Sequence, residues 1–209
     1  MCAIPAIWRD VPRLEGRHAL LEPLQAAHAG ELAQACADGA LWELWYANVP
    51  RPEAMPAYVD AALRAREAGT QLPFVVRDAA GRVAGTTRFY ELAPEVPRLS
   101  IGYTWYAASA QRTGLNTQAK RLLLAHAFEA MGCIAVGFET SWFNHASRAA
   151  IARLGAKQDG VLRHHRRHAD GSVRDTVVFS ILDSEWPAVK RHLLGRGAGG
   201  APWQHGAQA

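Results

Sequence analysis

Residues 109–128, SAQRTGLNTQAKRLLLAHAF, place a short polar loop directly before an apolar run that favours a helix. The loop at residues 111–116 contains Gly114, carries the cation Arg112 and has no proline, so all its backbone N–H groups can donate. The first four N–H groups of a helix lack partners within that helix, and the helix dipole adds positive charge there. This stretch therefore predicts an anion site at the start of a helix.

The helix behind the loop has one apolar face. Leu124, Ala127, Phe128 and Met131 recur at i, i+3, i+4 and i+7, which is the spacing of side chains that share one side of a helix. Gly132 follows directly and is a typical helix C-terminus. We expect this face to be buried.

Length and composition favour one large domain. The chain has 209 residues, of which 49% are hydrophobic and 20% charged, so it can bury a full core. We expect a single domain over residues 1–194 and a disordered Gly/Ala-rich tail over residues 195–209. The formal charge is +4, and residues 163–168 are the only long basic run, which favours an anionic small ligand over a nucleic-acid track.

The cysteines give no sign of a disulfide framework or a metal site. The chain has an odd number of cysteines, Cys2, Cys36 and Cys133. They are far apart in the sequence, and none has a second ligand residue at the spacing of a metal site. No basic segment followed by an apolar run opens the chain, and polar residues interrupt the longest apolar stretch, residues 122–138. We therefore expect a soluble, cytoplasmic protein without a metal or a membrane partner.

Periodicity and turn signals predict a mixed order of strands and helices. The expected elements are a strand at 18–24, helices at 26–37 and 51–69, strands at 72–78, 83–92 and 98–107, the helix after the loop, a strand at 133–140, a helix at 144–156, a hairpin with its turn at 169–172, and a short helix from Ser184. This order indicates an α/β fold with a mixed sheet.

Four segments in this order carry a resemblance to a known family. They are LEGRHALLEPL (14–24), IGYTWYAASAQRTGLNTQAK (101–120), NHASRAAIARLGA (144–156) and DGSVRDTVVFSILDSEW (170–186). The chain resembles the GNAT superfamily of N-acetyltransferases, in the branch that includes ribosomal-protein N-terminal acetyltransferases. The resemblance implies a mixed, mostly antiparallel sheet of about seven strands flanked by helices. It also implies a splayed strand pair that forms the acetyl-CoA cleft.

The same resemblance assigns the anion at the loop. The acetyl-CoA loop of this family follows the pattern Q/R-x-x-G-x-G/A, and Gln111, Gly114 and Asn116 occupy its defined positions. Asn116 departs from the pattern, because the family prefers a residue with little or no side chain there. The implied pyrophosphate-binding residues are Gln111, Arg112, Thr113, Gly114, Leu115 and Asn116.

The resemblance also implies where the pantetheine arm of acetyl-CoA runs. It would pair with the backbone of the strand before the loop, which includes Tyr106 and Ala107, and it would touch Asn144. Both assignments have a plainer alternative: the strand residues can pack in the sheet, and Asn144 can cap the helix that follows it. The two kinds of role are compatible.

The implied chemistry is direct attack of a neutral amine on the thioester, which needs no cysteine nucleophile. Many superfamily members use a tyrosine in the helix after Asn144 as the acid, and this helix has none. Ser147 matches the serine that related N-terminal acetyltransferases have there, and its alternative is an ordinary helix hydroxyl. Glu91, Glu139 and His164 are weak candidates for the base.

Because the sequence offers only weak candidates for the general base, it favours an acceptor whose amine has a low pKa. An α-amino group of pKa near 7.8 is about 10–15% neutral at pH 7, whereas a lysine near 10.4 is less than about 0.1% neutral. The acceptor would then be a protein N-terminal α-amino group or a small-molecule amine.

We expect the acceptor pocket between the first two helices and the final hairpin. Trp42, Trp45 and Tyr46 stand at i, i+3 and i+4 in residues 41–50, a spacing typical of a buried helical face as well as of a binding platform. Tyr103, on the strand before the loop, is a further candidate for the pocket.

Other kinds of function stay open from the sequence alone. The missing tyrosine and Asn116 are compatible with a regulatory module that binds acyl-CoA without turnover. The pI of 9.2 is compatible with an RNA- or ribosome-associated protein, although basic residues interleaved with aromatics on one face would then be expected. A homodimer is also open.

Overall fold

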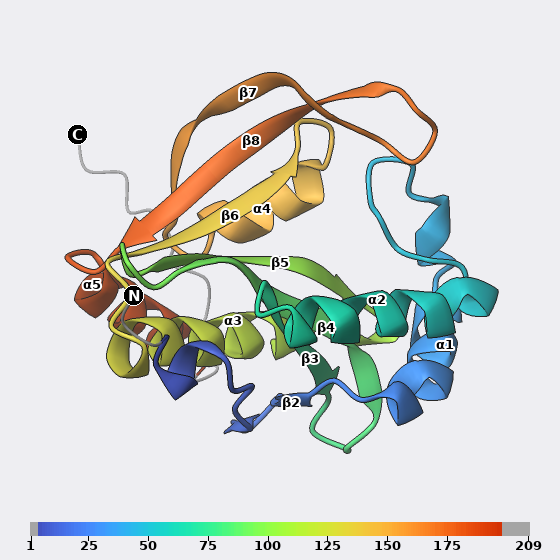
Figure 1. Ribbon diagram of the computed structural model, residues 1–209, viewed down its shortest axis with the longest axis horizontal. Helices are drawn as coiled ribbons and strands as arrows, with labels where there is room; N and C mark the ends of the chain where they lie inside the picture. The colour runs from blue at the N-terminus through green and yellow to red at the C-terminus, as the bar shows by residue number, and fades with distance from the viewer. Residues whose placement is uncertain (1–3, 198–209) are drawn as a thin grey trace, which may run out of the picture.

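The computed structural model describes residues 4–197, and within them eight strands form one sheet in the order β1-β2-β3-β4-β5-β6-β8-β7 (Figure 1). The strands are β1 (Leu14–Glu15), β2 (Leu20–Pro23), β3 (Gln71–Arg77), β4 (Val83–Ala93), β5 (Arg98–Tyr106), β6 (Ala135–Ser141), β7 (Lys157–Arg167) and β8 (Val173–Leu182). The α-helices are α1 (Ala29–Ala37), α2 (Met55–Glu67), α3 (Leu115–Ala125), α4 (His145–Ala152) and α5 (Trp186–Gly197). The mixed α/β fold predicted from the sequence is confirmed.

Helices cover both faces of the middle of the sheet. On one face α3 contributes Leu123 and Leu124 to a core that also contains Phe74 and Phe89. On the other face α1 and α2 pack on a second core that includes Val75 of β3. Residues 84–90 of β4 are all buried, as expected for a central strand covered on both sides.

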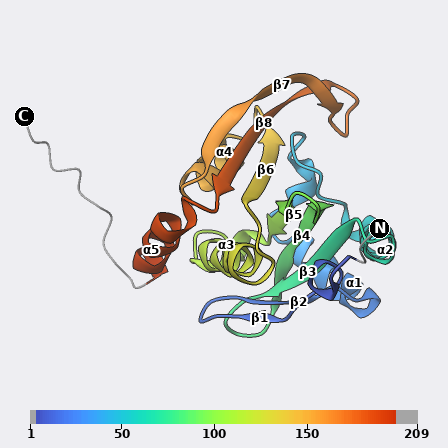
Figure 2. The same ribbon diagram turned by 60° about the vertical axis from the view of Figure 1, so that its left-hand side comes forward.

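The sheet opens between β5 and β6, its one parallel pair. Only three residue pairs join these strands, and the last is Ser100 with Gly137. From Phe138 onward β6 pairs with β8 alone, so the two strands diverge, as both views show (Figures 1 and 2). The segment 101–106 of β5 therefore has no neighbouring strand on this edge.

A β-bulge lies on the same stretch of β5. The register between β4 and β5 shifts at Thr87, which stands opposite both Tyr103 and Thr104. Tyr103 has a φ of 52°, in the left-handed region that few residues other than glycine adopt. Bulges of this kind re-aim side chains and are common beside active sites.

Some elements differ from the sequence expectations. The sheet has eight strands rather than about seven, because the two-residue strand β1 is too short to give a pattern. In residues 41–50 only Leu41–Glu43 form a helical turn, and Leu44 is extended, so the aromatic residues that follow do not continue a helix. Of the two alternatives for this spacing, the helical face is therefore not formed. Helix α5 runs to Gly197, and the rest of the predicted tail lies outside the described residues.

Gly85 provides a test of the tight pairing between β4 and β5. A Cβ atom at this position would lie 2.0 Å from the backbone oxygen of Trp105, so the strands would have to separate. Gly85→Ala should lower the free energy of unfolding by about 1–3 kcal/mol in urea denaturation. Gly160→Ala, at a strand position with no atom within 4 Å of the added carbon, is the matched control and should be neutral or stabilising. Equal stability of the two variants would contradict the packing described here.

Candidate active site

The loop before α3 presents a run of free backbone donors. Arg112 has a φ of 62° and Gly114 a φ of 88°, and Gly114 is the N-cap of α3. Within residues 4–197, none of the N–H groups from Arg112 to Thr117 meets an acceptor, and the first helical bond runs from Gln118 N to Gly114 O at 3.0 Å. Such a loop at a helix N-terminus suits a phosphate group.

Side chains of the loop hold its shape. The Gln111 Nε2 atom donates to the Tyr106 carbonyl at 3.1 Å, and the Thr113 hydroxyl donates to the Ala110 carbonyl at 2.7 Å. Leu115 is buried in the core beneath the loop. These three side chains point to a structural role, and the backbone N–H groups remain available to a ligand.

A further contact ties the entry of the loop to α1. The Ser109 N–H group donates to Asp38 Oδ2 at 3.0 Å, and hydrogen bonding from Ser109 lowers the pKa of this carboxyl group. The loop is thus fixed at its start and at its end.

The two asparagines predicted to bind cofactor have different surroundings. Asn116 is half-buried, and its Oδ1 atom has no partner within the described residues. Asn144 is the N-cap of α4, where its Oδ1 atom accepts from the Ser147 N–H group at 2.9 Å. Ser147 lies in the first turn of α4, which begins just past the end of β6.

Tyr106 and Ala107 lie at the loop end of β5, and both are buried. Burial raises the pKa of the Tyr106 phenol. The Ala107 N–H group donates to the Ala84 carbonyl at 2.8 Å. The side chain of Tyr106 therefore packs in the core, which agrees with the packing role that the sequence leaves open for the residues of this strand.

Near the opening of the sheet lies a cavity of about 400 Å³. Tyr103 is 43% exposed at this cavity, and its phenol oxygen accepts from Gln71 Nε2 at 3.4 Å. The lining residues come from the turn after α2 and from β3, β4, β5 and β7, and they include Gln71, Tyr90, Glu91, Tyr103 and Arg166. The cavity thus lies between the turn after α2 and strand β7 of the final hairpin, and Tyr103 is the one residue predicted for the acceptor pocket that lines it.

The carboxylates considered as bases are engaged by other groups. Arg166 Nη2 lies 2.9 Å from Glu139 Oε2 and 3.9 Å from Glu91 Oε1. Glu91 also accepts from the Ser100 hydroxyl at 2.8 Å. His164 is an exposed residue of β7. None of the three is an unpaired carboxylate or imidazole buried beside the cavity.

Trp45 joins the segment 41–50 to the hairpin. Its ring centroid lies 4.9 Å from that of His168 and 5.3 Å from that of Phe143. A third contact, to Tyr46, is edge-on at 5.7 Å. These aromatic contacts hold segment 41–50 against the end of the hairpin. None of these aromatic residues lines the 400 Å³ cavity.

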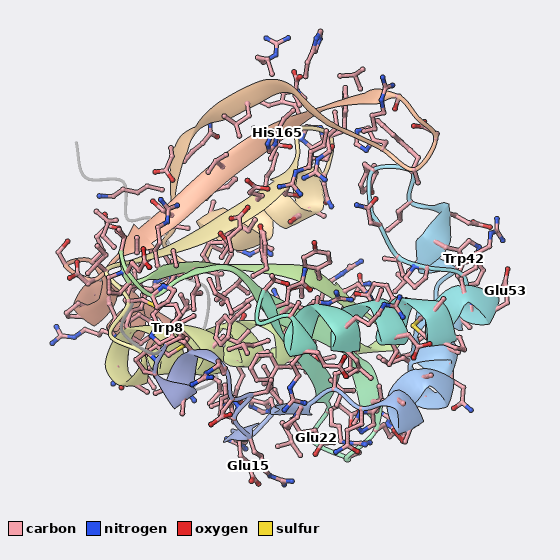
Figure 3. The ribbon with its side chains drawn as sticks, viewed as in Figure 1. Trp8, Glu15, Glu22, Trp42, Glu53 and His165 are labelled. Carbon is pink, nitrogen blue, oxygen red and sulfur yellow. The ribbon has the colours of Figure 1, made fainter. Side chains whose placement is uncertain are left out.

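Trp42 lies apart from this aromatic group. The guanidinium of Arg51 stacks over its ring at 5.9 Å, and Figure 3 shows Trp42 at the same end of the molecule as Glu53. Trp42 is partly buried against the second core and does not line the 400 Å³ cavity.

Lys120 is a feature that the sequence reasoning missed. It is 5% exposed on α3, and its Nζ atom lies 2.6 Å from Thr104 Oγ1 and 3.3 Å from Thr87 Oγ1, at the bulge. Burial lowers the pKa of Lys120 to about 7. The signal was present, because Lys120 shares the i, i+3, i+4 spacing of the apolar face with Leu123 and Leu124.

Comparisons with known proteins agree with this geometry. The Acetyltransferase (GNAT) domain family matches residues 18–157. "Putative ribosomal N-acetyltransferase YdaF" of Bacillus subtilis is 30% identical over 110 residues, which span 53% of this chain and 59% of that protein. The chain belongs to the GNAT acetyltransferase family.

Solved structures share the fold. A GCN5-related N-acetyltransferase from Brucella melitensis is 30% identical with a TM-score of 0.79, and the match covers 89% of this chain and 85% of that one. RimJ of Mycobacterium smegmatis, in complex with CoA-disulfide, is 24% identical with a TM-score of 0.75, over 91% and 96% of the two chains. At that identity, RimJ is similar in fold alone.

Two features are absent from residues 4–197. No helix in this range is long and apolar enough to cross a membrane. No group of three or more His, Cys, Asp and Glu residues in it could hold a metal ion.

The lowered pKa of Lys120 makes stability depend on pH. Between pH 7 and about 10.4 the unfolded chain binds a proton at this lysine that the folded chain has lost, so folding becomes more favourable as pH rises. Lys120→Met removes the buried amine, so its gain in melting temperature over the wild type should be largest at or below pH 7. The gain should shrink toward pH 10. A difference that stays constant across this range in calorimetry would show that Lys120 keeps an ordinary pKa.

Proposed function

We propose that the protein transfers the acetyl group of acetyl-CoA to a primary amine. The observation that carries the proposal is the run of free N–H groups at the start of α3, directly beside the opening between β5 and β6. GNAT acetyltransferases use acetyl-CoA, and its pyrophosphate matches the donors and the helix dipole of this loop. Arg112, exposed on the loop, supplies a further charge-assisted bond.

The pantetheine arm then lies in the opening. The unpaired edge of β5 at residues 101–106 offers backbone donors and acceptors to the amide groups of the arm. This route leads from the loop toward the bulge at Tyr103 and Thr104, with the 400 Å³ cavity near it. In the proposal the thioester meets the amine there.

Acetyl transfer proceeds by direct attack of the neutral amine on the thioester carbonyl. The C–N bond forms, the C–S bond breaks, and the amine loses a proton while the thiolate gains one. We assign the donor of that proton to Ser147, in the first turn of α4. Tyr103 is the better alternative than Tyr106, because Tyr103 is exposed at the cavity and Tyr106 is buried in the core.

The acceptor in this proposal is a protein N-terminal α-amino group. Glu91 and Glu139 both face Arg166, so neither carboxylate is a free base, and an amine of low pKa needs the least help. The name of the Bacillus subtilis relative, "Putative ribosomal N-acetyltransferase YdaF", is consistent with such an acceptor.

The basic run at residues 163–168 supports this function over RNA binding. Arg163 pairs with Asp175 at 2.6 Å, and Arg166 pairs with Glu139. His168 is buried against Trp45. Because several of these basic groups have partners within the protein, the run does not form a free basic track.

A thiol-release assay with acetyl-CoA and three kinds of amine tests the proposal. The panel holds a peptide with a free N-terminus, the same peptide with a blocked N-terminus and a free lysine, and small amines. Mass spectrometry of the products locates the acetyl group. Acetylation of the free N-terminus is expected, and acetyl-CoA binding without acetylation of any amine would favour the regulatory module.

Gly114→Val tests the loop directly. The added side chain occupies space that the protein leaves open, with no heavy atom within 4 Å, and strains a residue at a φ of 88°. The dissociation constant for acetyl-CoA should rise tenfold or more in calorimetric titration, about 1.4 kcal/mol. Gly132→Val, at the far end of the same helical segment, introduces similar strain at a φ of 68° and should leave affinity unchanged. Unchanged affinity in folded Gly114→Val would place the cofactor elsewhere.

Ser147→Ala tests the proposed acid. General acid catalysis contributes about 10²- to 10⁴-fold, and a thiolate is a fairly good leaving group, so turnover should fall about tenfold to a hundredfold. Affinity for acetyl-CoA should change little, because the variant keeps the N–H group that Asn144 binds. Ser184→Ala, an exposed serine after β8, serves as the control. Full turnover of Ser147→Ala from pH 6 to 9 would show that the hydroxyl has no part in catalysis.

A further inference from the structure

Arg88 is a buried cation on the central strand β4 with no carboxylate partner among the described residues. It is 4% exposed, and its guanidinium lies between the rings of Tyr58 and Tyr103, at 4.6 Å and 4.5 Å from their centroids. Nη1 donates to Gln71 Oε1 at 2.9 Å. The other edge of the guanidinium, Nε and Nη2, is buried and has no hydrogen-bond partner in residues 4–197.

Two more donors near this face of the sheet are also without a partner in the described range. They are Tyr58 Oη, on α2, and Trp105 Nε1, on β5. Arg88 and Trp105 lie on the same side, because Thr86 pairs with Trp105 and stands two residues before Arg88. Buried donors without acceptors cost free energy, and a buried cation without an anion costs more. A cluster of such groups indicates a missing anionic acceptor.

Arg88 lies directly behind side chains that line the 400 Å³ cavity. Gln71 and Tyr103 both line the cavity and both contact Arg88. Tyr103 is 43% exposed and lies in the bulge, so its ring can turn away from Arg88 without breaking the regular strand pairing on either side. When it does, the guanidinium that the Tyr103 ring covers becomes accessible from the cavity.

We propose that the acceptor carries a carboxylate group near its amine, and that Arg88 binds this carboxylate at the cavity beside Tyr103. A guanidinium edge with two parallel N–H groups matches the two oxygens of a carboxylate. The inference rests on the proposed acetyl transfer and adds the chemical class of the acceptor. This carboxylate is either the α-carboxylate of a free amino acid or an acidic side chain beside the N-terminus of a peptide.

The test compares matched pairs of acceptors in the acetyl-CoA assay. One pair is a free amino acid and its amide. The other is a peptide whose second residue is aspartate and the same peptide with asparagine there. The wild type should use one of the carboxylates with a kcat/KM at least tenfold above that of its neutral counterpart, and the pair that shows this preference identifies the source.

Arg88→Gln should remove the preference. The ratio of kcat/KM for the carboxylate acceptor to kcat/KM for its neutral counterpart should fall about 10- to 100-fold, because a hydrogen-bonded charge pair is lost. Arg82→Gln removes the same charge from an exposed turn and should keep the wild-type preference. Calorimetric titration of acetyl-CoA shows whether Arg88→Gln is folded. If it is not, Arg88→Lys replaces it and should weaken the preference because lysine lacks the fork.

The outcomes separate this inference from the function on which it rests. Acetylation of neutral and carboxylate acceptors with equal kcat/KM by the wild type would overturn the role of Arg88 and leave the acetyltransferase standing. An unchanged preference in folded Arg88→Gln would do the same, and would place the carboxylate on another cation. Failure to acetylate any acceptor would count against the proposed function itself.

Discussion

The separation of β5 from β6 is the constraint on which the rest of the structure depends. Hydrogen bonding between them stops at Ser100 and Gly137, although both strands continue. Backbone N–H and C=O groups in the middle of a sheet need partners, so an edge opened inside the sheet must face water or a ligand. The loop before α3 and the start of α4 both lie next to this opening because each follows one of the two diverging strands. The cofactor site in this account is therefore a consequence of topology.

Two buried basic side chains flank the bulge on opposite sides of the sheet. On the side of α3, the amine of Lys120 contacts the hydroxyls of Thr87 and Thr104. On the side of α2, the guanidinium of Arg88 lies between two tyrosine rings. Hydrophobic residues in these positions would cost less free energy to bury. Positions that break the hydrophobic pattern without a structural gain tend to be functional, and both of these lie at the site where we place the reaction.

Most helices and strands could be predicted from the sequence because the patterns that mark them are local. The apolar face of α3, the N-cap at Asn144 and the turn at Gly171 are each set by residues a few positions apart. The parts that could not be predicted depend on contacts across the chain. Trp45 packs on His168 of the hairpin instead of continuing a helix, and the partners of Lys120 come from two strands. Arg88 lies within a strand-like run, where the sequence alone does not show whether its charge is paired.

The most direct test of the central claim is amide hydrogen exchange with and without acetyl-CoA. If the cofactor occupies the opening between β5 and β6, amide exchange should slow at residues 112–117 of the loop and at residues 101–106 of β5. Exchange in the part of the β7–β8 hairpin that is distant from Tyr103 should stay unchanged. Protection confined to other parts of the chain, with these two segments unaffected at saturating acetyl-CoA, would contradict the account.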